Sequence, residues 1–321
     1  MDNHLTVHSN RTGLMDPIRH LADLEETVRG GPRMTMAVAA GEDPATIHAI
    51  IRAVTDGLIR AVLVGSTQKI EALINEADSA AVQDIKIINS DEETASAKIA
   101  VQLVHTGQAD FLMKGLVGTS VFMKAILDKE SGLIPPNGLL SHIAVMEVPS
   151  YPKLILFSDA AVILNPTMDE KVKILNYAIQ VAHSLGIKMP KVALVSAVEK
   201  ISFKLQSSID AAVIKAMAER KQIEGAIVDG PLALDVALSE EHCRIKGLES
   251  PINGKADILI FPNIETANTF YKSLTVLAHG KSASVMVGGK APAVITSRAD
   301  SDDSKFYSIV LAARMTAHVG E

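Results

Sequence analysis

The sequence predicts an α/β fold, in which helices cover both faces of a sheet. Short apolar segments alternate with amphipathic ones along the chain, which is the pattern of βαβ units. The chain has no Trp, seven Phe and four Tyr, so Ala, Val, Ile and Leu must fill the core, as they do in covered parallel sheets. Its 321 residues are about twice a typical domain. We therefore expect a two-domain αβα sandwich.

The predicted strands are short runs rich in β-branched and other apolar residues, separated by stretches with helical periodicity. Helix-start signals such as Ser66-Thr-Gln-Lys and Ser90-Asp-Glu-Glu precede amphipathic segments. The expected strands are residues 34–39, 60–64, 85–88, 109–113, 143–148, 154–157, 191–195, 225–228, 256–261, 284–287 and 294–296.

One place breaks the alternation of strands and helices. The strands at 143–148 and 154–157 follow each other closely, with only Pro149-Ser-Tyr-Pro152 and a few flanking residues between them. A connection of this length leaves no room for a crossover helix. We expect the second domain to begin near this point.

Composition excludes several classes of function. The net charge is −6 and aromatic residues are few, whereas nucleic-acid surfaces are basic and use aromatic rings for stacking. Cys243 is the single cysteine and cannot form an internal disulfide, which favours a reducing cytoplasm. No apolar run is long enough to span a bilayer, and no secretion signal opens the chain. We therefore expect a cytoplasmic protein that binds neither nucleic acid nor membrane.

Small polar clusters follow several of the predicted strands. The carboxyl ends of parallel strands meet at one edge of a sheet, where open α/β folds bind ligands. Each cluster alone is weakly specific, because turns and helix caps use the same residue types. Their repetition predicts a substrate site formed by Lys114, Gly115, Thr119, Asp159, Asp229, Asn263, Thr266 and Asn268.

The last cluster, Thr296-Ser-Arg-Ala-Asp-Ser301, joins a buried strand to the first turn of a helix. Backbone N–H groups at a helix start carry partial positive charge and favour a phosphate. Arg298 would add a forked and permanently charged clamp, with Ser297 as a hydrogen-bond donor. The alternative is an ordinary strand–loop–helix in which Arg298 is a solvated surface charge.

Better-known motifs are missing. No Gly-x-Gly-x-x-Gly follows a strand, which argues against a nicotinamide site. Gly280-Lys-Ser282 resembles the end of a Walker loop, but Thr275 occupies the position of the first glycine. The ten His residues show no zinc spacing, and no Gly-x-Ser-x-Gly elbow exists for a serine hydrolase. We therefore expect no metal site and no serine nucleophile.

Several longer segments together resemble the phosphate acetyltransferase and phosphate butyryltransferase family over roughly residues 34–318. The resemblance is closest to the butyryl branch. It rests on Met113-Lys-Gly-Leu-Val, Ser141-His-Ile-Ala-Val, Val228-Asp-Gly-Pro-Leu-Ala-Leu-Asp-Val-Ala-Leu-Ser-Glu-Glu241, Gly254-Lys-Ala-Asp-Ile, Pro262-Asn-Ile-Glu-Thr-Ala-Asn268, Phe270-Tyr-Lys-Ser-Leu-Thr275 and Thr296-Ser-Arg-Ala-Asp-Ser301.

The resemblance implies reversible transfer of a short-chain acyl group, butyryl rather than acetyl, between coenzyme A and inorganic phosphate. Acyl-CoA and phosphate would be substrates, with no tightly bound cofactor, and the enzyme would be a homodimer. The family resemblance also implies a fold like that of isocitrate and isopropylmalate dehydrogenases, with the cleft between two domains. The chain would then form a first domain from residues 1–140 and 287–321 and a second from 141–286.

The resemblance also implies roles for individual residues. Ser297 and Arg298 match the Ser-Arg pair of the acetyl branch, and His142 joins the substrate-binding set. An acid a few positions later is the proposed thiol base, but its ungapped match here is Ser304. We predict that Asp303 takes that role; the alternative is that Asp303 only satisfies the dipole of its helix.

This chain departs from the acetyl pattern in two places. An Arg expected after the Tyr-Lys dipeptide is replaced by Thr275 and Val276, and an Asp-Cys-Ala sequence becomes Asp159-Ala-Ala161. These departures favour the butyryl branch, with cations supplied by Lys114, Lys272 or Lys281. Two other functions stay open, an oxidoreductase of the isocitrate dehydrogenase type and a non-catalytic protein that binds acyl-CoA for regulation.

Overall fold

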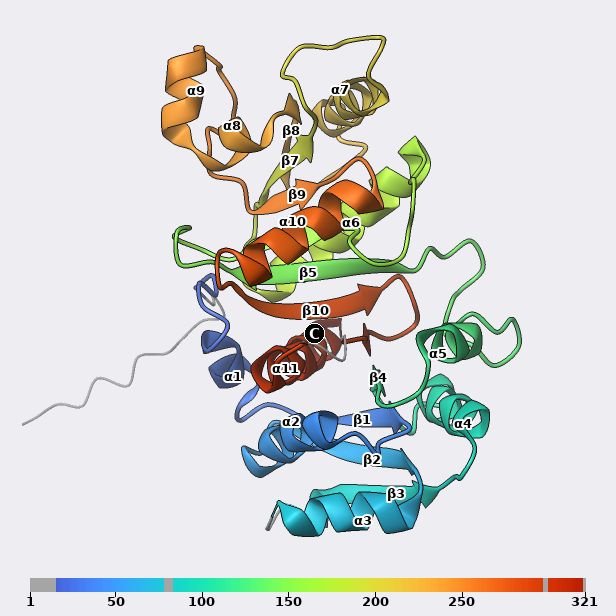
Figure 1. The fold of residues 1–321 in the computed structure, drawn as a ribbon. Helices are drawn as coiled ribbons and strands as arrows, with labels where there is room; N and C mark the ends of the chain where they lie inside the picture. Colours follow the sequence, from blue (N-terminus) through green and yellow to red (C-terminus); the bar gives the residue numbers. More distant parts are fainter. Residues whose placement is uncertain (1–15, 78–82, 297–299, 320–321) are drawn as a thin grey trace, which may run out of the picture.

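A computed structural model describes residues 16–77, 83–296 and 300–319. Within them the strands form one mixed sheet in the order β3-β2-β1-β4-β11-β10-β5-β6-β9-β7-β8. In Figure 1 this sheet runs from β3 at the bottom of the molecule to β7 and β8 at the top. Segments far apart in the sequence meet in the middle of the sheet, because the C-terminal strands β10 and β11 lie between β4 and β5.

All of the strands expected from the sequence form. They are β1 (Met34–Ala39), β2 (Ile59–Gly65), β3 (Ile85–Asn89), β4 (Phe111–Lys114), β5 (Ser141–Glu147), β6 (Ile155–Ser158), β7 (Lys191–Val195), β8 (Ile227–Leu232), β9 (Ile258–Ile260), β10 (Lys281–Val287) and β11 (Ala293–Val294). The main difference is at β8, which continues through Asp229-Gly-Pro231, beyond the expected end of the strand at residue 228.

The two outer parts of the sheet are parallel, but its centre is antiparallel. β5 runs antiparallel to both β6 and β10, and β10 runs antiparallel to β11. Seven residue pairs join β5 to β10, from Lys281 opposite Glu147 to Val287 opposite Ser141. This central ladder joins the parallel strands on its two sides into one sheet.

Some of the helices begin at recognisable side-chain caps. Asp43 accepts a hydrogen bond from the backbone of Thr46 at the start of α2, and Thr167 and Glu170 form a capping box at α6. The helices are α1 (Asp23–Val28), α2 (Pro44–Thr55), α3 (Thr67–Glu76), α4 (Glu93–His105), α5 (Thr119–Ile126), α6 (Met168–Ser184), α7 (Gln206–Glu219), α8 (Leu234–Leu238), α9 (Glu240–Lys246), α10 (Ile264–Val276) and α11 (Asp302–Val319).

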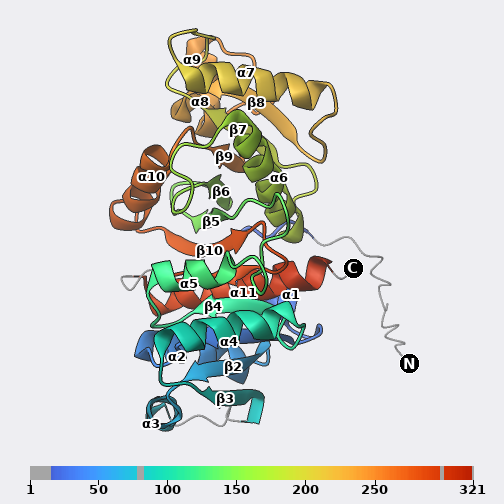
Figure 2. The same cartoon turned by 90° about the vertical axis from the view of Figure 1, so that its right-hand side faces the viewer.

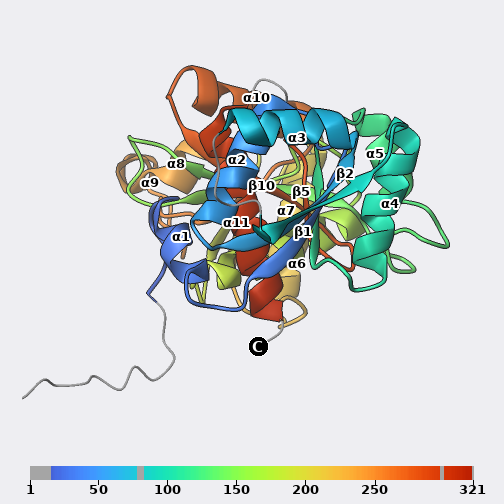
Figure 3. The ribbon, with the colours of Figure 1, turned by 90° about the horizontal axis from the view of Figure 1, so that it is seen from below.

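The helices form a layer on each face of the sheet. One apolar cluster joins one face to α1, α2, α3, α6, α7 and α11. On the other face there are two separate clusters, one under α4 and α5 and one under α8, α9 and α10. Figure 3 shows α1 and α2 on the opposite side of β1 from α4, and Figure 2 shows α6 and α10 on opposite sides of β5, β6 and β9.

The central strands take part in both layers because side chains alternate along a strand. Ile143 and Val145 of β5 belong to the continuous cluster, whereas Ala144 and Met146 face the other side. The gap between the two separate clusters therefore lies over β5 and β10.

The C-terminal segment returns to the N-terminal strands. β11 pairs in parallel with β4, and α11 packs on β10, α2 and α1. The division into two domains at residues 140 and 287 stays a prediction. In the part of the chain that is described, no helix is both long enough and apolar enough to cross a membrane.

Candidate active site

A cavity of about 400 Å³ lies over β5 and β10, between α5 and α10. Strand residues form one wall, the two helices form the sides, and the loop after β6 and the segment after β11 complete it. Of the predicted site residues it includes three, from α5, β5 and α10. The described residues that line it are Thr119, Met123, His142, Ala160, Ala161, Val162, Asn268, Tyr271, Lys272, Ser284, Met286, Ile295, Thr296 and Asp300.

Asp159 accepts hydrogen bonds from residues in and next to the wall of this cavity. Its side chain is buried, with Oδ2 accepting hydrogen bonds from Ser141 Oγ at 3.0 Å and the backbone N–H of His142 at 3.1 Å. Oδ1 accepts from the backbone N–H groups of Ala161 and Val162, both at 2.8 Å. One carboxylate thus fixes the start of β5 and the loop at residues 160–162. We predicted that Asp159 contacts substrate, and that role stays a prediction; its four described hydrogen bonds position residues of the cavity.

His142 lies on the cavity wall opposite Met286 in the β5–β10 ladder. Only 7% of its surface is exposed, and its Nδ1 is buried with no hydrogen-bond partner. Burial lowers the pKa of this imidazole, and the negative charges of Asp159 and Asp300 oppose that effect. A neutral, unpaired imidazole therefore faces the cavity.

Two further titratable residues in the cavity were not among the predicted site residues. Tyr271 donates to or accepts from Ser282 Oγ at 3.1 Å, and burial raises the pKa of its phenol. Asp300 lies close enough to raise the pKa of both Tyr271 and His142. Both residues fall within motifs quoted for the family resemblance, so the signal was present in the sequence. Lys272, one of three predicted cations, also lines the cavity.

The end of β4 brings the backbone of two chain segments together. Gly115 donates its N–H to Ala39 O at 2.9 Å, and a Cβ at this position would lie 2.1 Å from the carbonyl oxygen of Ala40. The Lys114 ammonium is buried and donates to Gly115 O at 3.2 Å. Neither Lys114 nor Gly115 is among the described residues that line the cavity. Lys281 is an exposed residue at the start of β10.

The motif at the start of α10 divides between two places. Asn268 lines the cavity and donates through Nδ2 to Ala160 O at 2.9 Å. Asn263 is the N-cap of α10, where its side chain accepts from the backbone N–H of Thr266 at 3.1 Å and from the Thr266 hydroxyl at 2.6 Å. The described bonds of Asn263 are thus those of a helix cap, and its role in substrate binding stays a prediction.

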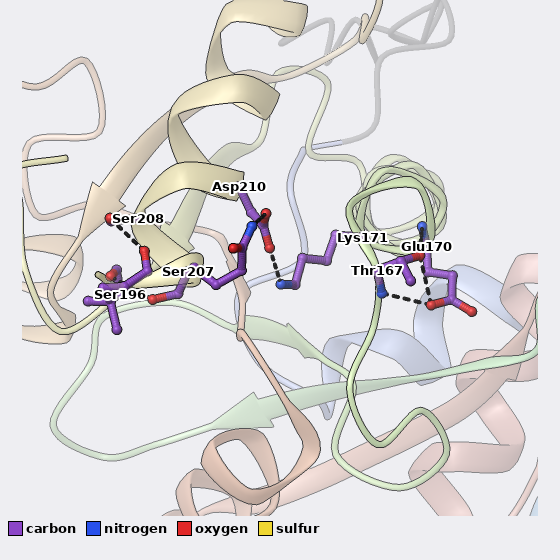
Figure 4. A network of polar contacts seen from close by, with 9 residues as sticks. Thr167, Glu170, Lys171, Ser196, Ser207, Ser208 and Asp210 are labelled. Carbon is purple, nitrogen blue, oxygen red and sulfur yellow. Dashed lines mark hydrogen bonds and ion pairs between the residues drawn. The ribbon is translucent and has the colours of Figure 1, made fainter. Parts of the chain in front are cut away.

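A second cavity of about 470 Å³ lies near Asn263, and a buried ion pair forms part of its wall. Lys171 Nζ lies 2.6 Å from Asp210 Oδ2, with 8% and 5% of the two side chains exposed. Figure 4 shows this pair beside the Thr167–Glu170 capping box, with Ser207 next to it. Every charge at this pair is balanced, so no group in it is left to act on a ligand.

Asp229 lies elsewhere. Its carboxylate accepts hydrogen bonds from the backbone N–H of Gly230 at 2.9 Å and from Ser250 Oγ at 2.5 Å, and Lys215 Nζ lies 2.7 Å away. These contacts tie β8 to α7 and to the segment before β9. Asp229 is not brought to the cavity with His142 and Asn268.

The start of α11 also holds a predicted site residue. Asp303 Oδ1 lies 2.9 Å from Arg52 Nη1 of α2, and 57% of the Asp303 side chain is exposed. Ser304 donates its N–H to Ser301 Oγ at 3.2 Å, a helix cap. Ser297 and Arg298 lie outside the described residues. Thr296 and Asp300, on either side of them in the sequence, both line the cavity.

The described part of the site can donate and accept hydrogen bonds and can exchange a proton. It offers the hydroxyls of Thr119, Ser284 and Thr296, the charge of Lys272 and the imidazole of His142. Among the residues that the structure describes, no group of three or more His, Cys, Asp or Glu could hold a metal ion.

Solved structures of two phosphotransacylases have the same architecture. A branched-chain phosphotransacylase from Enterococcus faecalis aligns with a TM-score of 0.77 and 35% identity, over 88% of this chain and 99% of that one. A phosphotransacetylase from Streptococcus pyogenes has the same TM-score at 22% identity, over 92% of this chain and 98% of that one. The second likeness concerns the fold alone. The fold is therefore that of the phosphotransacylases.

Sequence comparison identifies the family. The family model described as phosphate acetyl/butaryl transferase matches residues 92–313. The phosphate butyryltransferase of Clostridium acetobutylicum is 42% identical over 92% of this chain and 98% of its own length. The phosphate acetyltransferase of Thermotoga maritima is 42% identical over 91% and 98%. The chain belongs to the phosphate acetyl/butyryl transferase family, which confirms the resemblance and the prediction of a phosphate acyltransferase.

One part of the fold prediction is wrong. The α/β class holds, but the aligned structures are phosphotransacylases, so the expected fold of the isocitrate dehydrogenase type does not hold. The alternation of strands and helices is shared by many α/β folds and does not distinguish them. The antiparallel centre of the sheet does not follow from that alternation. The oxidoreductase alternative has no support in these comparisons.

Proposed function

We propose that this protein catalyses the reversible transfer of a short-chain acyl group, butyryl rather than acetyl, between coenzyme A and inorganic phosphate. Membership of the family supports the reaction class. We propose the cavity between α5 and α10 as the place of the reaction. The supporting observation is that a buried imidazole and a lysine line this cavity together with apolar side chains. Coenzyme A thioester and phosphate would both be substrates, and no tightly bound cofactor is required.

The anion-binding part of the site would be Ser297 and Arg298. The support is that Thr296 and Asp300, the described residues that flank them, both line the cavity. A guanidinium beside a helix start would bind phosphate and stabilise it as a leaving group, and a hydroxyl would hydrogen-bond the oxyanion that develops on the acyl carbonyl. Lys272, which lines the cavity, would add positive charge.

The acyl chain would lie against the apolar lining. Met123, Val162, Met286 and Ile295 offer side chains of several carbons, while Ala160 and Ala161 leave space beside them. Each methylene that enters such a surface contributes about 0.8 kcal/mol. This lining favours butyryl over acetyl.

Asp303 was predicted as the thiol base. Its carboxylate pairs with Arg52, whose guanidinium also lies over the Phe306 ring, 3.6 Å from the ring centre. That contact joins α11 to α2. The pair favours a structural role for Asp303 over a role at the reacting thiol, and its role as base stays a prediction.

The first experiment is a thiol-release assay with butyryl-CoA and purified protein. We expect free coenzyme A to appear only when phosphate is added, together with an equal amount of butyryl phosphate. Binding of butyryl-CoA without phosphate-dependent release would support the alternative of a non-catalytic regulatory protein. Release that ignores phosphate would mean hydrolysis, and would contradict the proposal.

The second experiment tests the anion site by substitution. We expect Arg298→Ala to lower turnover by roughly 100-fold or more, the usual loss when one charge-stabilising donor is removed. Arg244→Ala is the matched control, because Arg244 is an exposed residue of α9. Near-normal turnover in Arg298→Ala would remove Arg298 from the site.

The third experiment measures chain preference. Rates with acetyl-, propionyl-, butyryl- and branched thioesters should rise from two to four carbons, by roughly fourfold for each methylene that contributes about 0.8 kcal/mol. A preference for acetyl-CoA would contradict the butyryl proposal while leaving the reaction class intact.

We also propose that the enzyme is a cytoplasmic homodimer. The single cysteine, Cys243, is buried and unpaired, in keeping with a reducing compartment. Light scattering of the purified chain should give about twice the monomer mass of 34.1 kDa. A monomer with full activity would contradict the proposed dimer.

A further inference from the structure

The imidazole of His142 differs in its surroundings from those of His105 and His183, which are also partly buried. His105 Nδ1 lies 2.9 Å from Gly132 O, and His183 Nε2 lies 2.9 Å from Gly225 O. By contrast, Nδ1 of His142 has no hydrogen-bond partner, although 93% of the residue is buried. Buried polar groups in folded proteins are nearly always paired, so an unpaired one needs an explanation.

The position of His142 offers that explanation. The residue lines the cavity in which acyl transfer is proposed, and its backbone is held firmly. Its N–H donates to Asp159 Oδ2 at 3.1 Å, and its carbonyl accepts from Ser158 Oγ at 2.8 Å. These bonds fix the backbone of His142 and leave its ring unused, so the side chain of this cavity-lining residue keeps hydrogen-bonding capacity of its own.

The electrostatic surroundings favour a ring that can accept and release a proton. Burial lowers the pKa of His142, which leaves the imidazole neutral near pH 7 and able to act as a base. Asp159 and Asp300 both favour the protonated form once it appears. The other titratable groups of the cavity lining are the phenol of Tyr271 and the ammonium of Lys272.

The other candidates for a proton acceptor fit less well. The family's acid is replaced by Ser304, whose hydroxyl does not ionise near neutral pH. Asp303 is paired with Arg52. A thiol with an ordinary pKa of roughly 8.5 is mostly protonated at pH 7, so its attack gains from a base in the cavity.

We propose that His142 is a catalytic residue that carries the proton between the thiol of coenzyme A and the phosphate. The proposal rests on the acyl-transfer function proposed above. In the direction of thioester synthesis, the imidazole accepts the thiol proton while sulfur bonds to the acyl carbon. The bond from that carbon to the phosphate oxygen then breaks. The imidazolium gives its proton to the departing oxygen, so that hydrogen phosphate leaves and His142 is neutral again. Phosphate attack on the thioester follows the same steps in reverse.

The test is the pH dependence of turnover in His142→Gln, which keeps a polar side chain but cannot carry a proton. Loss of a general base typically costs 100-fold to 10,000-fold. We expect a loss in that range at pH 6.5. The loss should shrink as the pH approaches and passes roughly 8.5, because the thiolate then forms without a base. His105→Gln, which alters another partly buried histidine away from the cavity, is the matched control and should keep normal turnover at every pH.

The outcomes separate this proposal from the proposed function. A wild-type protein without phosphate-dependent transfer overturns both. An active wild type with a His142→Gln variant of normal rate overturns the proton role alone. A loss that stays constant from pH 6.5 to 9 also overturns it, because a hydrogen bond to the carbonyl or a packing defect would act equally at each pH.

A second measurement does not depend on the His142→Gln variant keeping its full activity. In NMR spectra of protein carrying ¹³C-labelled histidine, the signal of the His142 ring is the one that is absent from His142→Gln. The pKa read from this signal should lie below the ordinary value of about 6.5. Asp300→Asn should move that titration, and the acidic limb of the rate profile, to lower pH, because a negative charge that favours the imidazolium is gone. An unchanged titration and limb in Asp300→Asn would overturn the proposed coupling between the two side chains.

Discussion

Asp159 provides the sharpest test of how the site is held together. The buried carboxylate accepts four hydrogen bonds, two at each oxygen, and three of the donors are backbone N–H groups. In Asp159→Asn one oxygen is replaced by an NH₂ group, which cannot accept. If the remaining oxygen keeps Ala161 and Val162, the Ser141 hydroxyl can rotate to become an acceptor, but the N–H of His142 is left facing another donor.

The size of the effect follows from these bonds. One buried donor left unsatisfied costs about 1–3 kcal/mol, and loss of the carboxylate charge from the remaining bonds adds about 1 kcal/mol. We therefore expect Asp159→Asn to lower the free energy of unfolding by about 2–4 kcal/mol. Asp159→Ala, which strands all three backbone donors, should cost more. Urea denaturation read by circular dichroism would measure both variants.

Asp128 is a matched control for Asp159. Its carboxylate likewise accepts from backbone N–H groups two and three residues ahead, those of Glu130 and Ser131, but it is exposed. Water can replace those bonds, so Asp128→Asn should cost much less than Asp159→Asn. Equal losses in the two variants would refute the argument that burial sets the cost.

Three further predictions concern other parts of the molecule. Lys171→Met should lower the free energy of unfolding by about 3–5 kcal/mol in urea denaturation, because it leaves the buried carboxylate of Asp210 without its partner. Adding Asp210→Leu should restore much of the loss. A double variant less stable than the single one would contradict this. Gly115→Ala should lower the free energy of unfolding by about 1–3 kcal/mol, measured as a lower melting temperature, because its Cβ would lie 2.1 Å from a carbonyl oxygen. Gly31→Ala is the control and should cost little, because the nearest atom to its Cβ would be 3.5 Å away. Equal losses in the two variants would count against a steric cause. Because the pKa of His142 is lowered on folding, the unfolded chain binds the proton first as the pH falls below about 6.5, and each pH unit then costs up to about 1.4 kcal/mol until the folded pKa is reached. His142→Gln should therefore lose less stability than wild type between pH 7 and pH 5, and an equal loss would contradict the lowered pKa.

The strands were predictable because apolar β-branched runs are a local signal. Every expected strand forms. The longer extent of β8 was missed because Asp229-Gly-Pro231 contains the usual residues of a turn. In the structure these residues continue β8, a strand at the edge of the sheet, and the neighbouring Lys215 and Ser250 satisfy the carboxylate of Asp229.

Site residues were harder to predict, because a polar residue after a strand looks the same whether it serves a substrate or its own backbone. Asp159 and Asn268 both follow strands of the sheet, yet the first is occupied by four internal bonds while the second lines the cavity. The buried pair Lys171–Asp210 joins two helices that are distant in sequence. No local sequence pattern predicts such a pair, because its two residues come into contact only after the helices pack.

The antiparallel ladder between β5 and β10 limits how the candidate pocket can change shape. His142 and Met286 face each other across this ladder, so the floor of the pocket is a run of interstrand hydrogen bonds. Spreading the floor would break those bonds in a row. A change in the shape of the pocket is therefore expected at its sides, which Met123 of α5 and Tyr271 of α10 help to form, and not in the sheet beneath it.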